Sequence, residues 1–222
     1  MKPKSKGKLA IFDTFKTKNQ ELTGEAKRQR EIITILGSNV NPAERTRTGI
    51  SQKIAKKQGI TWKNIYSGIF RDLDEILLPM GIAEENGRLP LKRGPKALQE
   101  KGIPYYHLTK KGVLVKLSIN GVENMSSEFK KFFAESEPNE KKFETILSKF
   151  MTNSPTFTYS IFQKYVKAFC EDKIKELLPF DLSKLQDIPD ENLIIQKEIV
   201  LAFEKLSSKE KKEAIVFLEK IT

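Results

Sequence analysis

A short run of polar side chains at helical spacing is the part of this sequence best suited to recognise another molecule. With about 100° per residue, one side of a helix after the N-cap Thr61 carries Lys63, Asn64, Ser67 and Arg71. Arginine and asparagine can form paired hydrogen bonds, Arg71 with a guanine edge and Asn64 with an adenine edge. The first acidic residue of this helix is Asp72. The early turns of the helix therefore favour a polyanion, and the later turns repel phosphate. The alternative is an ordinary solvated helix face.

The opposite side of the same helix is apolar from Ile65 to Leu77. Trp62, Tyr66 and Phe70 lie four residues apart, which is also the pattern of a stacking platform for single-stranded nucleic acid. Because aliphatic residues accompany them, a packing role in the core is the favoured interpretation.

The preceding residues must position this helix. A first helix is expected over 24–36, capped by Thr23 and followed by Gly37. A shorter helix ends at Gly59, a buried Ile60 follows, and the Thr61 helix begins, as in a helix-turn-helix. The shorter helix carries three cations expected to contact phosphates, namely Lys53, Lys56 and Lys57.

Beyond Gly81, two strand segments are expected at 82–91 and 105–109, around a basic loop. The cations of the loop are Lys92, Arg93, Lys96 and Lys101. These cations are expected either to bind DNA phosphates or to enter a minor groove of DNA. The alternative is that they only keep the loop soluble. Thr109 caps a further helix over 110–119.

This order of elements resembles the winged helix-turn-helix transcriptional regulators over residues 20–120. The resemblance is carried by Ile50-Ser-Gln-Lys-Ile-Ala-Lys-Lys-Gln-Gly-Ile-Thr61, Met80-Gly-Ile-Ala-Glu84 and Tyr106-His-Leu-Thr-Lys-Lys-Gly112, with a wing longer than usual. It implies three helices plus a small β wing, and together with the C-terminal helical domain read from the later residues this gives a mainly α fold. It also implies sequence-specific binding of double-stranded DNA and regulation of transcription. The alternative is a winged-helix scaffold for protein interactions in a transcription or replication assembly.

The chain is expected to have three parts: a basic flexible arm over 1–20, the DNA-binding domain over 21–120 and a helical domain over 121–222. The last is expected to dimerise or to bind an effector or partner. Its helices are predicted at 126–135, 140–151, 157–178, 191–206 and 209–221, the last behind a capping box at Ser207. The helices at 157–178 and 191–206 carry more apolar surface than one narrow stripe, which favours a homodimer through residues 121–222. The alternative is that these helices cover one another within one chain.

Composition excludes several classes of protein. Of the 222 residues, 40 are Lys or Arg and 29 are Asp or Glu, a net charge of +11. Residues 1–120 hold 24 basic and 11 acidic side chains (+13), and residues 121–222 hold 16 and 18 (−2). A single Cys170 and a single His107 exclude disulfides within the chain and cysteine-based or paired-histidine metal sites, and they are expected to be structural. We expect a cytosolic protein with no membrane span, cofactor or enzymatic activity.

Overall fold

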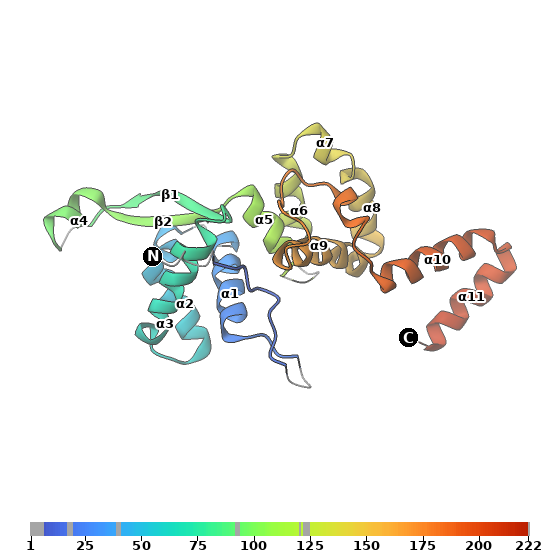
Figure 1. Ribbon diagram of the computed structural model, residues 1–222, viewed down its shortest axis with the longest axis horizontal. Helices are drawn as coiled ribbons and strands as arrows, with labels where there is room; N and C mark the ends of the chain where they lie inside the picture. Colours follow the sequence, from blue (N-terminus) through green and yellow to red (C-terminus); the bar gives the residue numbers. More distant parts are fainter. Residues whose placement is uncertain are drawn as a thin grey trace. The chain divides into compact units, whose positions relative to one another are not determined.

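The computed structural model describes residues 7–16, 20–38, 41–91, 94–119, 121 and 125–221. They form two compact units, the first ending at Ser183 and the second beginning at Lys184. The described chain is mainly helical and contains one two-stranded antiparallel sheet (Figure 1). None of the described helices has the length and apolar character that crossing a membrane requires. The expected boundary between the DNA-binding domain and the C-terminal helical domain, near residue 120, lies inside the first unit. The division of functions between these two parts of the chain stays a prediction.

Three consecutive helices form the N-terminal part of the first unit. They are α1 (Gly24–Ser38), α2 (Arg47–Gln58) and α3 (Trp62–Arg71), with a 3-10 turn η1 (Pro42–Arg45) before α2 and a π-helical segment η2 (Asp72–Leu77) after α3. Their buried faces meet through Ile32, Ile50, Ile54, Ile69 and Leu73. The predicted caps at Thr23 and Gly59 are confirmed: Thr23 Oγ1 accepts from the Ala26 N–H at 3.1 Å, and Gly59 is left-handed with φ 67°.

Strand β1 (Ala83–Leu89) pairs with β2 (Ile103–Leu108) in antiparallel register, from Ala83 opposite Leu108 to Leu89 opposite Ile103. The connection contains the short helix α4 (Lys96–Lys101). Gly102 enters β2 with φ 71°, and a Cβ there would lie 2.6 Å from the Leu89 carbonyl oxygen, so a side chain has no room. The prediction of two strands is confirmed, but the segment between them that was expected to be a basic loop contains the helix α4.

The end of the hairpin explains the residue types from Thr109 to Gly112. Thr109 Oγ1 accepts from the Gly112 N–H at 3.2 Å and donates to the Gly81 carbonyl oxygen at 2.6 Å, which caps α5 (Lys110–Leu117). A Cβ on Gly112 would come within 2.1 Å of the Ile82 carbonyl oxygen. Only glycine allows α5 to approach the start of β1 this closely.

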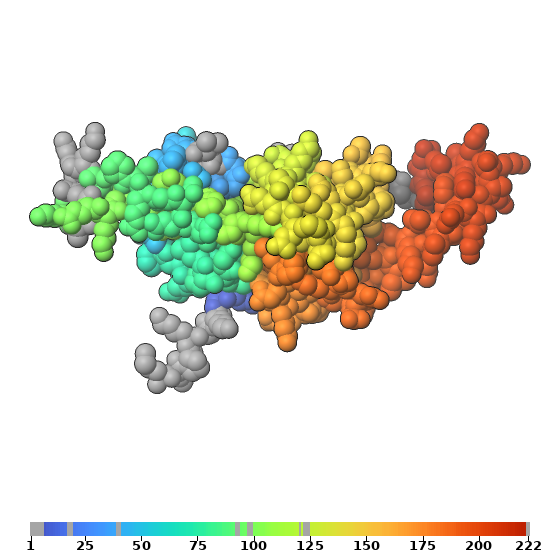
Figure 2. Space-filling view, turned by 90° about the horizontal axis from the view of Figure 1, so that it is seen from above, coloured from blue at the N-terminus to red at the C-terminus, as the bar shows by residue number. Residues whose placement is uncertain are grey.

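The rest of the first unit closes around an aromatic core. Its helices are α6 (Met125–Ala134), α7 (Pro138–Lys141), α8 (Glu144–Asn153) and α9 (Pro155–Cys170), whose side chains, yellow to orange in Figure 2, are continuous with one another. The rings of the core are those of Phe129, Phe132, Phe133, Phe162, Tyr165 and Phe180. Two buried carboxylates tie these helices to α5: Glu128 accepts from Lys116 Nζ at 2.9 Å, and Glu140 accepts from Lys110 Nζ.

Several sequence predictions need correction. The helix expected to reach residue 178 ends at Cys170, because the left-handed Asp172 (φ 59°) turns the chain back, where the Tyr165 hydroxyl donates to the Leu177 carbonyl oxygen at 3.1 Å. The helix expected over 140–151 is split into α7 and α8. Gly37 lies inside α1 rather than beyond it.

Two further corrections concern burial. Ile60 is 43% exposed, because the left-handed Gly59 reverses the chain and places Ile60 on the outside of the turn. Leu9 and Ile11 are buried, so this part of the expected flexible arm is packed. Here the Ala10 N–H donates to the Gln29 side chain of α1 at 2.8 Å. Residues 1–6 lie outside the described residues.

The second unit contains two helices, α10 (Glu191–Lys205) and α11 (Ser208–Ile221), and a 3-10 turn η3 (Leu182–Leu185) spans the division between the units. Asp190 caps α10 by accepting from the Leu193 N–H at 3.1 Å. The predicted capping box is confirmed: the Ser207 N–H donates to Glu210 at 2.8 Å, and the Glu210 N–H donates to Ser207 Oγ at 3.4 Å. No residue of α10 is buried.

Candidate nucleic-acid interface

The predicted polar face of α3 is exposed along its whole length, at Thr61, Lys63, Asn64, Ser67 and Arg71. Thr61 begins the helix with an extended backbone, and its carbonyl oxygen accepts from the Asn64 N–H at 3.0 Å, but its side chain makes no capping hydrogen bond. Within the described residues, the side chains of Lys63, Asn64 and Ser67 form no hydrogen bond or ion pair. These three side chains are therefore available to bind another molecule.

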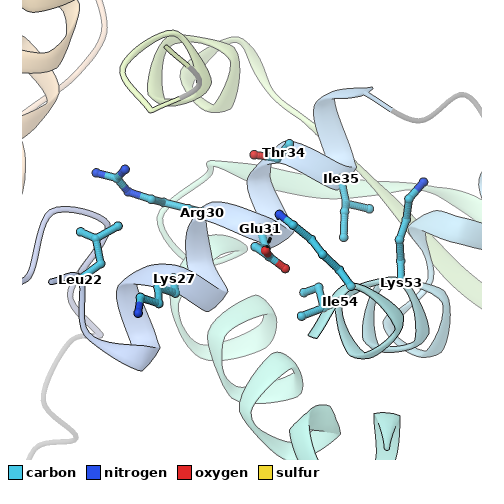
Figure 3. A pocket seen from close by; sticks show the side chains of 9 residues that line it. Leu22, Lys27, Arg30, Glu31, Thr34, Ile35, Lys53 and Ile54 are labelled. Atoms are coloured by element: carbon cyan, nitrogen blue, oxygen red, sulfur yellow. Dashed lines mark hydrogen bonds and ion pairs between the residues drawn. The ribbon is translucent and has the colours of Figure 1, made fainter. Parts of the chain in front are cut away.

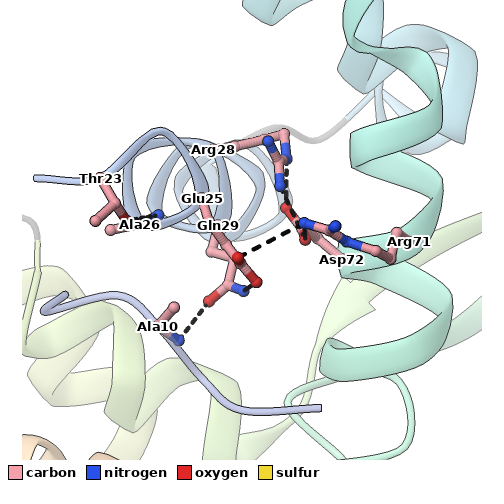
Figure 4. Close-up of polar contacts among 8 residues, drawn as sticks. All are labelled: Ala10, Thr23, Glu25, Ala26, Arg28, Gln29, Arg71 and Asp72. Carbon is pink, nitrogen blue, oxygen red and sulfur yellow. Dashed lines mark hydrogen bonds and ion pairs between the residues drawn. The ribbon is translucent and has the colours of Figure 1, made fainter.

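Arg71 differs from the other residues of this face. Its guanidinium lies 3.6 Å from Glu25 and 3.7 Å from Asp72 (Figure 4). Glu25 in turn accepts from the Gln29 side chain at 3.3 Å, which links Arg71 to the buried polar contacts of α1. A ligand anion at Arg71 must compete mainly with Glu25, because Asp72 also pairs with Arg28.

Two of the three carboxylates that follow Arg71 are paired with arginines, so the predicted repulsion of phosphate is weakened there, whereas the third, Glu75, is exposed. Asp72 is fully buried and accepts two hydrogen bonds from Arg28, at 2.5 and 3.2 Å (Figure 4). Asp74 accepts two from Arg47, at 2.9 and 2.5 Å. Each of these two negative charges is neutralised by a paired arginine.

Arg47 also fixes the surroundings of the polar face of α3. Its guanidinium carbon lies 5.1 Å from the centre of the Phe70 ring and 5.2 Å from that of Tyr106 on β2. Phe70 is 46% exposed, so the prediction of a core position is wrong for this ring. Trp62 and Tyr66 are half-buried and contact each other edge to face, with ring centres 5.7 Å apart. Burial raises the pKa of Tyr106 to about 12, so this phenol stays neutral.

The three cations of α2 are exposed, as a role in phosphate binding requires. Lys53 lies 2.7 Å from Glu44, and Lys57 lies 2.7 Å from Glu31. Exposed pairs of this kind contribute only about 0–1 kcal/mol, so a phosphate can replace the carboxylate partner.

A groove of about 490 Å³ between α1 and α2 adds cations that the sequence analysis missed (Figure 3). Its lining includes Lys27 and Arg30 of α1 together with Lys53 and Lys57 of α2. Arg30 donates to the Ile11 carbonyl oxygen at 2.6 Å, and burial lowers the pKa of its guanidinium. The signal available in the sequence was the recurrence of cations at 27 and 30 on one helix, but only the packing of α2 brings Lys53 and Lys57 beside them.

The predicted wing residues are only partly placed. Lys96 and Lys101 are exposed on α4, and Lys92 and Arg93 lie outside the described residues. On β1, Arg88 pairs with Glu85 at 2.6 Å. Lys96 and Lys101 are therefore accessible at the far end of the hairpin from α5.

The two side chains with the greatest catalytic potential, His107 and Cys170, lie in surroundings that favour a structural role. His107 Nε2 lies 3.1 Å from Glu84 across the two strands. Cys170 is buried, and burial raises the pKa of its thiol to about 12, which disfavours the nucleophilic thiolate. Within the described ranges no group of three or more His, Cys, Asp or Glu is arranged to hold a metal ion.

No protein-family model, curated protein or solved structure matches this chain.

Proposed function

We propose that this protein binds double-stranded DNA sequence-specifically and regulates transcription, with α3 in the major groove. The observation that carries the proposal is the exposed set of Lys63, Asn64 and Ser67 on the first turns of α3, whose side chains have no partner among the described residues. Recognition helices of helix-turn-helix proteins meet base edges through their N-terminal residues. In this proposal the β1–β2 hairpin is the wing.

Phosphate contacts supply most of the affinity in the proposed complex. The contributing cations are Lys53, Lys56 and Lys57 of α2 and Lys96 and Lys101 of α4, and Lys27 of the α1–α2 groove extends this surface. Such contacts release counterions, so the affinity falls linearly with salt on a log–log plot. The Lys56→Ala variant should reduce that slope by about one unit. Lys149→Ala, which removes an exposed cation from α8, should leave the slope unchanged.

The deciding experiment selects bound duplexes from a random library and measures Asn64→Ala on the enriched sequence and on random DNA. We expect a loss of about 1–3 kcal/mol on the enriched duplex and little change on random DNA, because a base contact carries sequence information. Asn153→Ala on α8 is the matched control and should bind both normally. Equal losses on both duplexes would reduce Asn64 to a phosphate contact, and a library without an enriched sequence would reject specific binding.

The pairing of Arg71 gives a second test of the same face. Glu25→Gln removes one of the two carboxylates near the Arg71 guanidinium, so duplex binding should become slightly tighter. The double variant Glu25→Gln with Arg71→Ala should lose this gain. A gain that persists without Arg71 would come from the lower negative charge alone.

A protein-interaction scaffold is the second candidate, favoured by two exposed apolar side chains near the ends of α3. Ile60 is 43% exposed and Phe70 is 46% exposed. Contact with a protein partner would cover both of them. Filter binding with random duplex separates the candidates: the DNA-binding proposal requires retention at low salt, and a scaffold does not.

A further inference from the structure

The second unit exposes an unusual amount of apolar side-chain surface. On α10, Ile194, Ile195, Ile199, Val200 and Leu201 are between 45 and 66% exposed, and on α11 the run from Ile215 to Phe217 is between 46 and 60% exposed. A stretch of 39 residues that buries so little of its apolar surface has no core of its own.

The apolar residues of α10 follow two sides of the helix. Ile195 and Ile199 lie on the side of Phe203, and Ile194 and Leu201, seven residues apart, lie on the other side. Helix α11 approaches the first side, where the Lys211 ammonium lies 5.8 Å from the centre of the Phe203 ring. Ile194 and Leu201 on the other side are 54 and 46% exposed, and Val200, which lies between the two sides, is 66% exposed. A helix that is apolar on two sides is typical of one packed between two others.

We infer that α10 and α11 form a dimerisation element whose partner is the same element of a second copy of this chain. These eight exposed apolar side chains of the two helices are each about half exposed, which corresponds to roughly 800 Å² per copy, the area that one partner contributes to a stable interface. The packing of four helices from two copies would cover both sides of each α10.

The charge of the element favours a second copy as the partner. Residues 184–222 hold 7 basic and 8 acidic side chains, a net charge of −1. The electrostatic attraction and repulsion between two copies of this element are therefore about equal. The first 120 residues, at +13, would repel one another. A two-fold symmetric pairing of α10–α11 is closed, which leaves no apolar surface for further growth.

This inference goes beyond the proposed function: it takes up the homodimer expected through residues 121–222 and narrows that range to 191–221. Two chains joined in this way would bring two α3 helices to one duplex. Dimerisation itself does not depend on DNA binding, so the two can fail separately.

The test is analytical ultracentrifugation of the full chain at 1–100 µM, roughly the range in which stable dimers form. The variants are Val200→Asp and Phe217→Asp, whose side chains are 66 and 60% exposed, so a charge there costs a single chain little. The matched control is Ile146→Asp, an apolar side chain of α8 that is 45% exposed. Circular dichroism checks that each variant keeps its helices, and filter binding to random duplex is measured in parallel.

We expect a dimer for the full chain and for Ile146→Asp, and a monomer for both α10–α11 variants. The inference is overturned by a monomeric full chain, by variants that remain dimeric, by open-ended association, or by a control that dissociates as the variants do. Dimers that do not retain duplex would reject DNA binding but keep the inference. Monomers that retain duplex would reject the inference but keep DNA binding.

Discussion

Helices α9 and α10 have nearly the same length, 16 and 15 residues, and both carry more apolar residues than one narrow stripe. In α9, Phe162, Tyr165 and Val166 are completely buried by neighbours from the same unit. In α10 no residue is buried. The comparison shows that apolar content reveals how much covering a helix needs, and that only the tertiary neighbours decide whether the same chain provides it.

The largest expected difference between the two helices is in the free energy of unfolding. Phe162→Ala should destabilise the first unit by about 3–5 kcal/mol, because the ring is fully buried and leaves a cavity. Val200→Ala on α10 should change the unfolding free energy of the first unit by less than about 0.5 kcal/mol, because Val200 belongs to the second unit and no residue of α10 is buried. Urea unfolding followed by the fluorescence of Trp62, the single tryptophan, reports the unfolding of the first unit for both variants. Equal effects of the two substitutions would remove the distinction between the helices.

An intermediate change in the free energy of unfolding is expected at Glu140, whose carboxylate joins α7 to Lys110 of α5. Burial acts to raise the pKa of this carboxyl, but hydrogen bonds from Lys110, the Phe180 N–H and the Glu137 N–H outweigh it and hold the pKa below its ordinary value of 4.5. The stabilisation is therefore present above pH 4.5 and is lost as the pH falls through the lowered pKa.

Glu140→Gln should accordingly cost about 1–3 kcal/mol of unfolding free energy at pH 7, and the difference from the native chain should shrink in acid. The exposed neighbour Glu135→Gln is the control and should show no such pH dependence. A difference that stays constant from pH 7 to pH 3 would show that the charge of Glu140 does not contribute.

The smallest effect is expected within the second unit. The Lys209 ammonium and the Glu213 carboxylate of α11 are 4.0 Å apart and largely exposed. Glu213→Gln should change the thermal midpoint very little, because exposed pairs one turn apart contribute below about 0.5 kcal/mol. A clear loss of helix by circular dichroism would show that this helix depends on its own side-chain pairs rather than on the covering of its apolar surface.

The parts of the fold that were predicted correctly depend on local chemistry. Gly59 ends α2 and Thr109 begins α5 because capping involves only neighbouring residues. The exposed face of α3 follows from helical periodicity alone, so Lys63, Asn64 and Ser67 are accessible as predicted. Their role in base recognition stays a prediction.

The errors have non-local causes. Phe70 fits the apolar period of α3, but its ring lies beneath the guanidinium of Arg47, which is distant in sequence. The groove cations Lys27 and Arg30 come together with α2 only through tertiary packing. The repulsion expected from Asp72 disappears because Arg28 pairs with it from another helix. Periodicity within one segment contains no information about such partners.

The position of Arg47 has a mechanical consequence. Through one guanidinium it is bonded to Asp74 and lies over the rings of Phe70 and Tyr106, so it joins the start of α2, the end of α3 and the strand β2. Relative sliding of the helices and the hairpin would break all three contacts together. These contacts hold the α3 face and the hairpin at a defined spacing, and a ligand that contacted both would have to match it.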